Sequence, residues 1–113
     1  MGKLNLRGLN IAIMGGGYPC KDILKLLLSD DLKDLDCIVL GVADSIAKTE
    51  GIRYAKEKNL FTTNDYSDLF NLENLDLILR TTLDDSLIDV IENARPFKAK
   101  LLNMDQYNAM SLI

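Results

Sequence analysis

The stretch LNIAIMGGGYPCKDILKLLL, residues 9–28, decides the fold. Its first six residues form a short apolar run, which is typical of a buried parallel strand, and three glycines follow at once. Pro19 suits the first turn of a helix, where its missing N–H would have no partner in any case. The helical face expected to be buried carries Ile23, Leu24, Leu27 and Leu28. The stretch therefore predicts a strand, a tight glycine turn and a helix.

The rest of the chain repeats this alternation. Further strands are predicted at residues 36–43, 60–63, 75–79 and 98–103. Helices are predicted from residue 49 or 50, at 67–72, from 84 or 85, and at 104–113. Strands that alternate with helices form parallel sheets, and right-handed crossovers place the helices on both faces. The predicted fold is an α/β, Rossmann-like three-layer sandwich with a mostly parallel sheet of about five strands.

A length of 113 residues suits one domain with one core, so residues 1–113 are predicted to form a single Rossmann-like domain. The last seven residues, YNAMSLI, are largely apolar. An apolar helix end calls for either a partner subunit or a continuation of the chain. We favour the second interpretation, in which this domain is the N-terminal part of a longer protein.

Charge and composition exclude several classes of function. The net charge of −4 and a scattered set of lysines argue against nucleic-acid binding, which needs a positive surface. No apolar run is long enough to span a bilayer or to form a secretory signal. Cys20 and Cys37 do not form a C-x-x-C pair, which favours two reduced thiols. These features predict a cytoplasmic protein without membrane insertion.

The chain contains no histidine. This excludes a Ser-His-Asp triad, a Cys-His pair and a histidine-ligated metal. Two pairs of carboxylates, at residues 30–31 and 84–85, fit helix capping and solvation better than metal binding. No catalytic residue and no metal ligand are therefore predicted, and this chain alone is not expected to be catalytic.

The glycine turn is the first candidate site. Residues 15–20, GGGYPC, fit the pattern G-x-G-x-x-A loosely. In that pattern, one glycine permits the turn, the next lets the backbone approach a pyrophosphate, and a third small residue, here Cys20, allows close packing. The helix start offers N–H groups and a positive dipole end, and Tyr18 could cover the site or stack on a ligand. Gly15, Gly16, Gly17 and Tyr18 are predicted to bind a cofactor; the alternative is a glycine turn without a ligand.

Two further segments end at the same edge of the predicted sheet. Asp44 closes the second strand, where a carboxylate can accept both hydroxyls of an adenosine ribose and would repel a 2′-phosphate, which favours NAD over NADP. The alternative is that Asp44 only caps the turn that follows. Arg80, Thr81 and Thr82 close the fourth strand. The two threonines are predicted cofactor contacts, whereas Arg80 could pair with an anion or be a residue of the surface or of an interface.

Four segments in this order resemble the NAD-binding half of glucose–fructose oxidoreductase-like dehydrogenases: residues 9–17, 41–44, 61–70 and 75–91. Homoserine dehydrogenases and related reductases share these motifs. The resemblance implies dinucleotide contacts at Gly15, Gly17 and Asp44, and a strand-end contact at Thr82. Two departures stand out. Cys20 replaces the third small residue, and residues 94–96, ARP, lack the lysine that serves catalysis in that family.

A second resemblance is to the Rossmann-like N-terminal region of bacterial PAS-containing sensor histidine kinases, carried by residues 6–10 and 60–70. It implies a cytosolic sensory domain that feeds a downstream kinase. The sequence thus supports three hypotheses. The main one is a signal-transduction sensor that binds NAD(H) or a similar dinucleotide without turnover and reports to downstream signalling domains or a homodimer partner. The alternatives are the cofactor-binding half of an NAD-dependent oxidoreductase and a ligand-free scaffold that dimerises.

Overall fold

A computed structural model describes residues 8–29, 36–46, 48–81 and 100–103, the last range as backbone only. The elements in these ranges are β1 (Asn10–Met14), α1 (Tyr18–Leu27), β2 (Ile38–Ala43), α2 (Glu50–Glu57), β3 (Phe61–Thr63), the 3-10 helix η2 (Tyr66–Asn71), β4 (Leu77–Arg80) and β5 (Lys100–Asn103). From β1 to β4, strands and helices alternate, as the sequence predicts.

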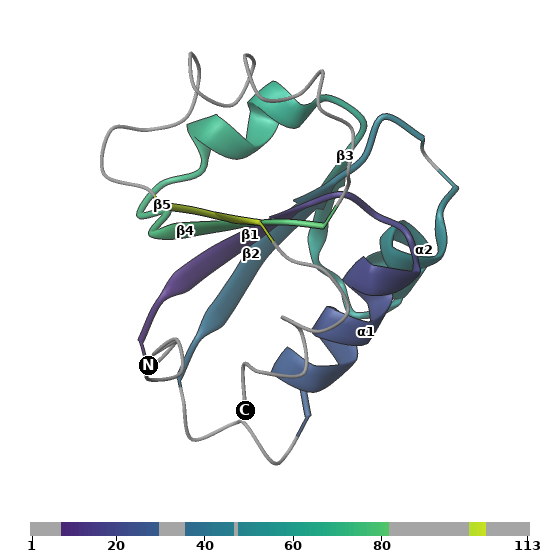
Figure 1. The fold of residues 1–113 in the computed structure, drawn as a ribbon, viewed down its shortest axis with the longest axis horizontal. Helices are drawn as coiled ribbons and strands as arrows, with labels where there is room; N and C mark the ends of the chain where they lie inside the picture. The colour runs from purple at the N-terminus through teal and green to yellow at the C-terminus, as the bar shows by residue number, and fades with distance from the viewer. Residues whose placement is uncertain (1–7, 30–35, 47, 82–99, 104–113) are drawn as a thin grey trace.

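The strands form one sheet in the order β3-β2-β1-β4-β5, and the four pairings between neighbours are parallel. The chain runs outward from β1 through β2 to β3 and then returns to the other side of β1 as β4. This reversal creates a switch point between β1 and β4, and ligands of open α/β sheets bind at the carboxyl ends of strands at such a point. Figure 1 shows α1 and α2 on one face of the sheet and η2 on the other. The predicted Rossmann-like fold is confirmed.

Alternate residues of β1 face two separate apolar clusters, because successive side chains of a strand point to opposite faces. Ile11 and Ile13 lie in the cluster beneath α1 and α2. Ala12 and Met14 lie in the smaller cluster beneath η2. All four side chains are fully buried. The apolar run in the sequence is therefore a central strand that is covered on both faces.

Most predicted boundaries lie within two residues of the observed ones. Pro19 is in the first turn of α1, as predicted. Asn59 follows α2 with a φ of 62°, a left-handed conformation of the kind that ends helices. The predicted short helix at 67–72 is the 3-10 helix η2, whose capping residue Asp65 accepts a hydrogen bond from the Ser67 N–H. β5 lies at an edge of the described sheet. The helices predicted from residue 84 and at 104–113 lie outside the described residues.

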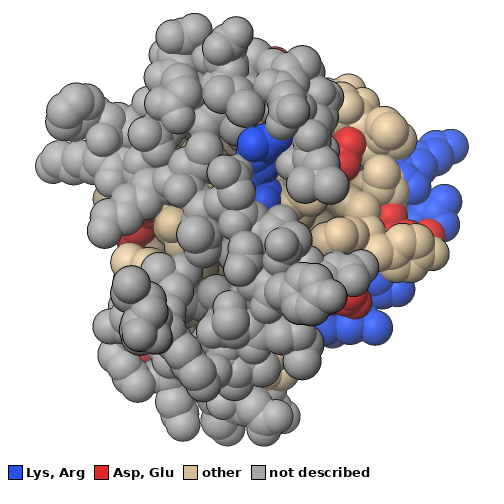
Figure 2. Space-filling view, viewed as in Figure 1, with Lys and Arg blue, Asp and Glu red and all other residues tan. Residues whose placement is uncertain are grey.

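None of the helices in the described ranges is long and apolar enough to cross a membrane. On the face drawn in Figure 2, the basic side chains of the described residues gather mainly on the side occupied by α1 and α2, with acidic side chains among them.

Candidate functional site

The glycine turn connects β1 to α1 at the carboxyl edge of the sheet. Gly15 has a φ of 114°, a left-handed conformation that side chains rarely adopt, so this position requires glycine. Its N–H donates to the Ala43 carbonyl oxygen at 2.7 Å. The turn is therefore fixed to the end of β2 as well as to its own strand.

Gly16 is the buried centre of the turn, and both of its backbone groups are engaged. Its N–H donates to Asp44 Oδ2 at 2.6 Å, and its carbonyl oxygen accepts from the Gly51 N–H at 2.6 Å. A Cβ at Gly16 would lie 2.6 Å from Thr49 Oγ1 and 2.7 Å from Ile52 Cγ1. Gly16 is thus glycine because α2 packs directly on it. Its N–H, a predicted cofactor contact, is bonded to Asp44 in this conformation.

The start of α1 is the open part of the turn. Gly17 is the N-cap residue, and a Cβ there would meet only Pro19 Cδ, at 3.8 Å. Within the described residues, no hydrogen bond engages the N–H groups of Gly17, Tyr18 and Cys20. Tyr18 is 66% exposed, so its side chain is not packed into the turn. Free N–H groups at a helix start, together with the helix dipole, make an anion-binding site.

Asp44 follows β2 and bridges two segments through its carboxylate. Oδ2 accepts from the Gly16 N–H, and Oδ1 accepts from the Ile46 N–H at 2.8 Å. The alternative role suggested by the sequence, a cap of the following turn, corresponds to the hydrogen bond from the Ile46 N–H. The side chain is half-buried, and each carboxylate oxygen can accept a second hydrogen bond. Asp44 can consequently hold the turn and still accept ribose hydroxyls.

Thr81 supports the turn from the β4 side. Its N–H donates to the Met14 carbonyl oxygen at 2.9 Å, and its hydroxyl donates to the Gly15 carbonyl oxygen at 3.0 Å. Because the hydroxyl proton is used in this way, Thr81 positions the turn in this conformation rather than offering a free donor. Arg80 is only 7% exposed, so the suggestion that it lies on the surface is wrong. Thr82 lies outside the described residues.

Sequence reasoning missed the contribution of α2. A Cβ at Gly51 would lie 2.6 Å from the Gly16 carbonyl oxygen and 2.8 Å from both Cβ and Sγ of Cys20. In the sequence, the only sign of this contact is a glycine inside a predicted helix, and such a glycine is often required by close packing. Cys20, the small third residue of the glycine motif, lies where α1 meets α2, and this contact explains why a small side chain is needed there.

Cys20 has a structural role at this contact. It is fully buried, and neither it nor Cys37 forms a disulfide. Burial, with a smaller effect from the negative charge of Asp44, raises the pKa of the Cys20 thiol to about 12. The group therefore stays protonated at neutral pH and acts as a small apolar side chain.

Replacing Asp44 by alanine is expected to destabilise the domain by about 1–3 kcal/mol, because the buried Gly16 N–H would lose its acceptor. Asp44→Asn should have an intermediate effect, since its one amide oxygen replaces two carboxylate oxygens. Urea unfolding followed by circular dichroism measures both changes. Asp65→Ala, which removes an exposed cap of η2, is the control and should have a smaller effect. Equal losses for Asp44→Ala and Asp65→Ala would contradict the bridging role.

No protein-family model matches the chain, and no curated protein matches its sequence. Solved structures share its fold. The chain is similar to homoserine dehydrogenase from S. aureus, with a TM-score of 0.63 and 17% identity over 92% of this chain and 29% of that one. It is also similar to the precorrin-2 dehydrogenase SirC, with a TM-score of 0.61 and 15% identity over 91% of this chain and 50% of that one.

A third similar structure is GenD2 from gentamicin A biosynthesis in complex with NAD, with a TM-score of 0.60 and 15% identity over 91% of this chain and 28% of that one. The chain thus spans half or less of each of these proteins. At such low identity the likeness establishes the Rossmann-like fold. None of the three is a sensor histidine kinase.

Proposed function

We propose that this chain is the dinucleotide-binding domain of an NAD-dependent oxidoreductase. The observation that carries the proposal is the open start of α1 at the switch point, with unengaged N–H groups at Gly17, Tyr18 and Cys20 and with Asp44 at the end of β2. The similar structures support an oxidoreductase over a sensor kinase, because two of them are dehydrogenases by name and a third was solved with NAD.

Each part of the site has a distinct task in this proposal. The N–H groups and dipole of α1 would hold the pyrophosphate, and Asp44 would accept hydroxyls of the adenosine ribose. A carboxylate at this place repels a 2′-phosphate, which favours NAD(H) over NADP(H). The bound cofactor supplies hydride transfer. The described residues supply binding and orientation, and we assign substrate recognition and turnover to other parts of the full-length protein.

The proposal is tested by following the melting temperature of the purified chain with NADH, NADPH, a flavin nucleotide and S-adenosylmethionine. NADH at about 100 times its dissociation constant should stabilise the fold by roughly 2.7 kcal/mol. NADPH should produce a smaller shift at the same concentration. A melting temperature that none of the four ligands changes would overturn the proposal. The sensor hypothesis predicts the same NADH shift, and the domains encoded with this chain distinguish the two.

A further inference from the structure

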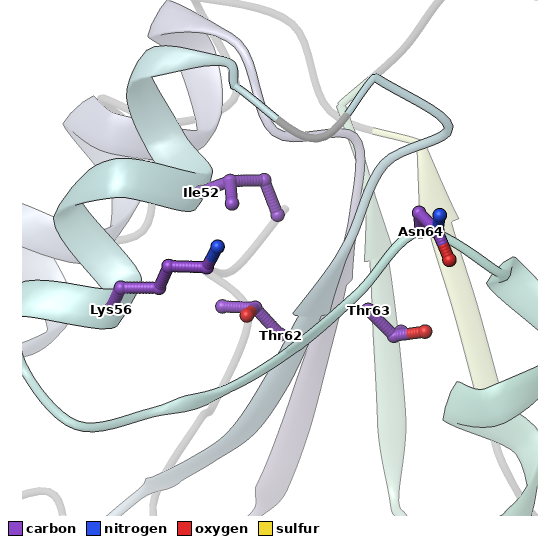
Figure 3. Close-up of a pocket in the computed structure, with 5 residues that line it drawn as sticks. All are labelled: Ile52, Lys56, Thr62, Thr63 and Asn64. Atoms are coloured by element: carbon purple, nitrogen blue, oxygen red, sulfur yellow. The ribbon is translucent and has the colours of Figure 1, made fainter.

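A second candidate site lies between α2 and β3, apart from the glycine turn. It is a pocket of about 290 Å³ lined by Ile52, Lys56, Thr62, Thr63 and Asn64. In Figure 3, Lys56 extends from α2 and its ammonium group lies between the side chains of Ile52 and Thr62, while Asn64 lies at the far end beyond Thr63. The volume is close to the lower limit of small-molecule sites, about 300 Å³. Among the described residues, the lining contains a cation and uncharged polar groups and no carboxylate.

The basic residues around α2 differ in their partners. Glu50 is shared by Lys21, at 3.9 Å, and Arg53, at 3.8 Å. Lys58 lies over the Tyr54 ring, 5.5 Å from its centroid. In the part of the chain that the structure describes, neither an ion pair nor a hydrogen bond engages the ammonium of Lys56. The cation that faces the pocket is therefore available to a ligand.

The hydroxyl and amide groups that line the pocket also differ in whether they have hydrogen-bond partners. The Thr63 hydroxyl accepts from the Asp65 N–H and donates to the Asp68 carboxylate, so it is already engaged. Among the described residues, the Thr62 hydroxyl and the Asn64 amide have no hydrogen-bond partner. An ammonium and a hydroxyl together can donate several hydrogen bonds to one oxyanion, and the Asn64 amide at the far end of the pocket can donate to another group of the same ligand.

We propose that this pocket binds the phosphate group of a small phosphorylated molecule. Lys56 supplies the positive charge, and Thr62 and Asn64 supply neutral donors. Two sources of such a phosphate are compatible with the location. One is a separate phosphorylated metabolite. The other is a phosphate on the adenosine end of a nucleotide, because the Asp44 N–H donates to the Thr63 carbonyl oxygen and so joins the pocket to the ribose side of the glycine turn.

The test is a titration of the isotope-labelled chain with sodium phosphate, followed by amide chemical shifts and compared with sodium chloride at the same ionic strength. Phosphate should shift the amides of residues 62–64. Lys56→Gln should weaken this binding about tenfold, as expected for the loss of one charge-assisted hydrogen bond. The matched control is Lys58→Gln, which removes the same charge two residues away and should change the affinity less than twofold.

The possible results separate this proposal from the proposed function. If Lys56→Gln and Lys58→Gln reduce the chemical-shift changes equally, phosphate acts by general charge screening, and this result would overturn the proposal of a phosphate site in the pocket. Shifts confined to Gly17 and Tyr18 would also overturn it, while supporting phosphate binding at the glycine turn. If Lys56→Gln lowers the affinity for NADPH but not for NADH, the phosphate belongs to the nucleotide. If phosphate shifts residues 62–64 and Lys56→Gln changes the affinity for neither dinucleotide, it belongs to a separate metabolite.

Discussion

Gly51→Ala is expected to lower the free energy of unfolding by about 1–3 kcal/mol, the usual cost of an additional methyl group in a close-packed interior. The new Cβ would lie 2.6 Å from the Gly16 carbonyl oxygen and 2.8 Å from Cys20. The Gly16 oxygen is a backbone atom and cannot rotate away. To make room, α2 would have to move off the turn and break the hydrogen bond from the Gly51 N–H to that oxygen.

The sign of this effect is diagnostic, because helix propensity alone predicts the opposite. Alanine is favoured over glycine inside a helix by roughly 0.5–1 kcal/mol. An unhindered Gly51 would therefore gain stability from the change, whereas a glycine packed against the turn would lose it. Displacement of Gly16 should also weaken NADH binding.

Urea unfolding measures the stability change, and the control is Gly17→Ser in the same turn. Serine is a good N-cap residue, and a Cβ at Gly17 has open space around it, so this variant should stay within about 0.5 kcal/mol of the unmodified protein. A Gly51→Ala variant as stable as Gly17→Ser would show that α2 does not rest on the glycine turn.

The sequence predicted most of the fold because its signals are local. The apolar run of β1, the glycine turn and Pro19 each act within a few residues, and the structure places them as expected. The type of η2 was less predictable, since a 3-10 helix and a short α-helix have similar patterns. Strand order was not predicted, because the general rules for βαβ units indicate parallel pairing and the hand of a crossover but not which strands are neighbours.

The site was less predictable because its contacts join distant segments. Asp44 and Gly16 are 28 positions apart, and their hydrogen bond depends on how β2 ends beside the turn. Thr81 and Gly15 are 66 positions apart. A pattern of residues indicates which groups reach the carboxyl edge of the sheet, but not which of them bond to one another there. Hence Gly51 was missed, and the hydrogen bond from Thr81 to the turn was not anticipated.

Gly17→Asp is expected to weaken NADH binding at least tenfold while leaving the stability of the fold unchanged or slightly higher. Gly17 has the extended conformation of an N-cap residue but no side chain to cap with. Because Pro19 lacks an N–H, an aspartate there would accept a hydrogen bond from the Cys20 N–H. Replacing glycine by aspartate at an N-cap is worth only a few tenths of a kcal/mol. The added carboxylate would stand where we propose that the pyrophosphate binds.

The magnitude follows from the electrostatics of the helix start. Two unit charges about 4 Å apart repel by roughly 4 kcal/mol at an effective dielectric constant of 20, and each 1.4 kcal/mol is a tenfold change in affinity. Gly17→Asn is the matched control, since it has the same shape and the same capping bond without the charge. NADH fluorescence titrations give the affinities, and thermal unfolding gives the stabilities.

The comparison between the two variants decides how the ligand is held. If Gly17→Asp loses NADH and Gly17→Asn largely retains it, the start of α1 faces a negatively charged group. If both lose it equally, the added volume or the occupied Cys20 N–H is responsible, and repulsion plays little part. If both bind NADH as tightly as the unmodified protein, the diphosphate lies elsewhere. The unengaged N–H groups of α1 would then be satisfied by water, as at most exposed helix starts.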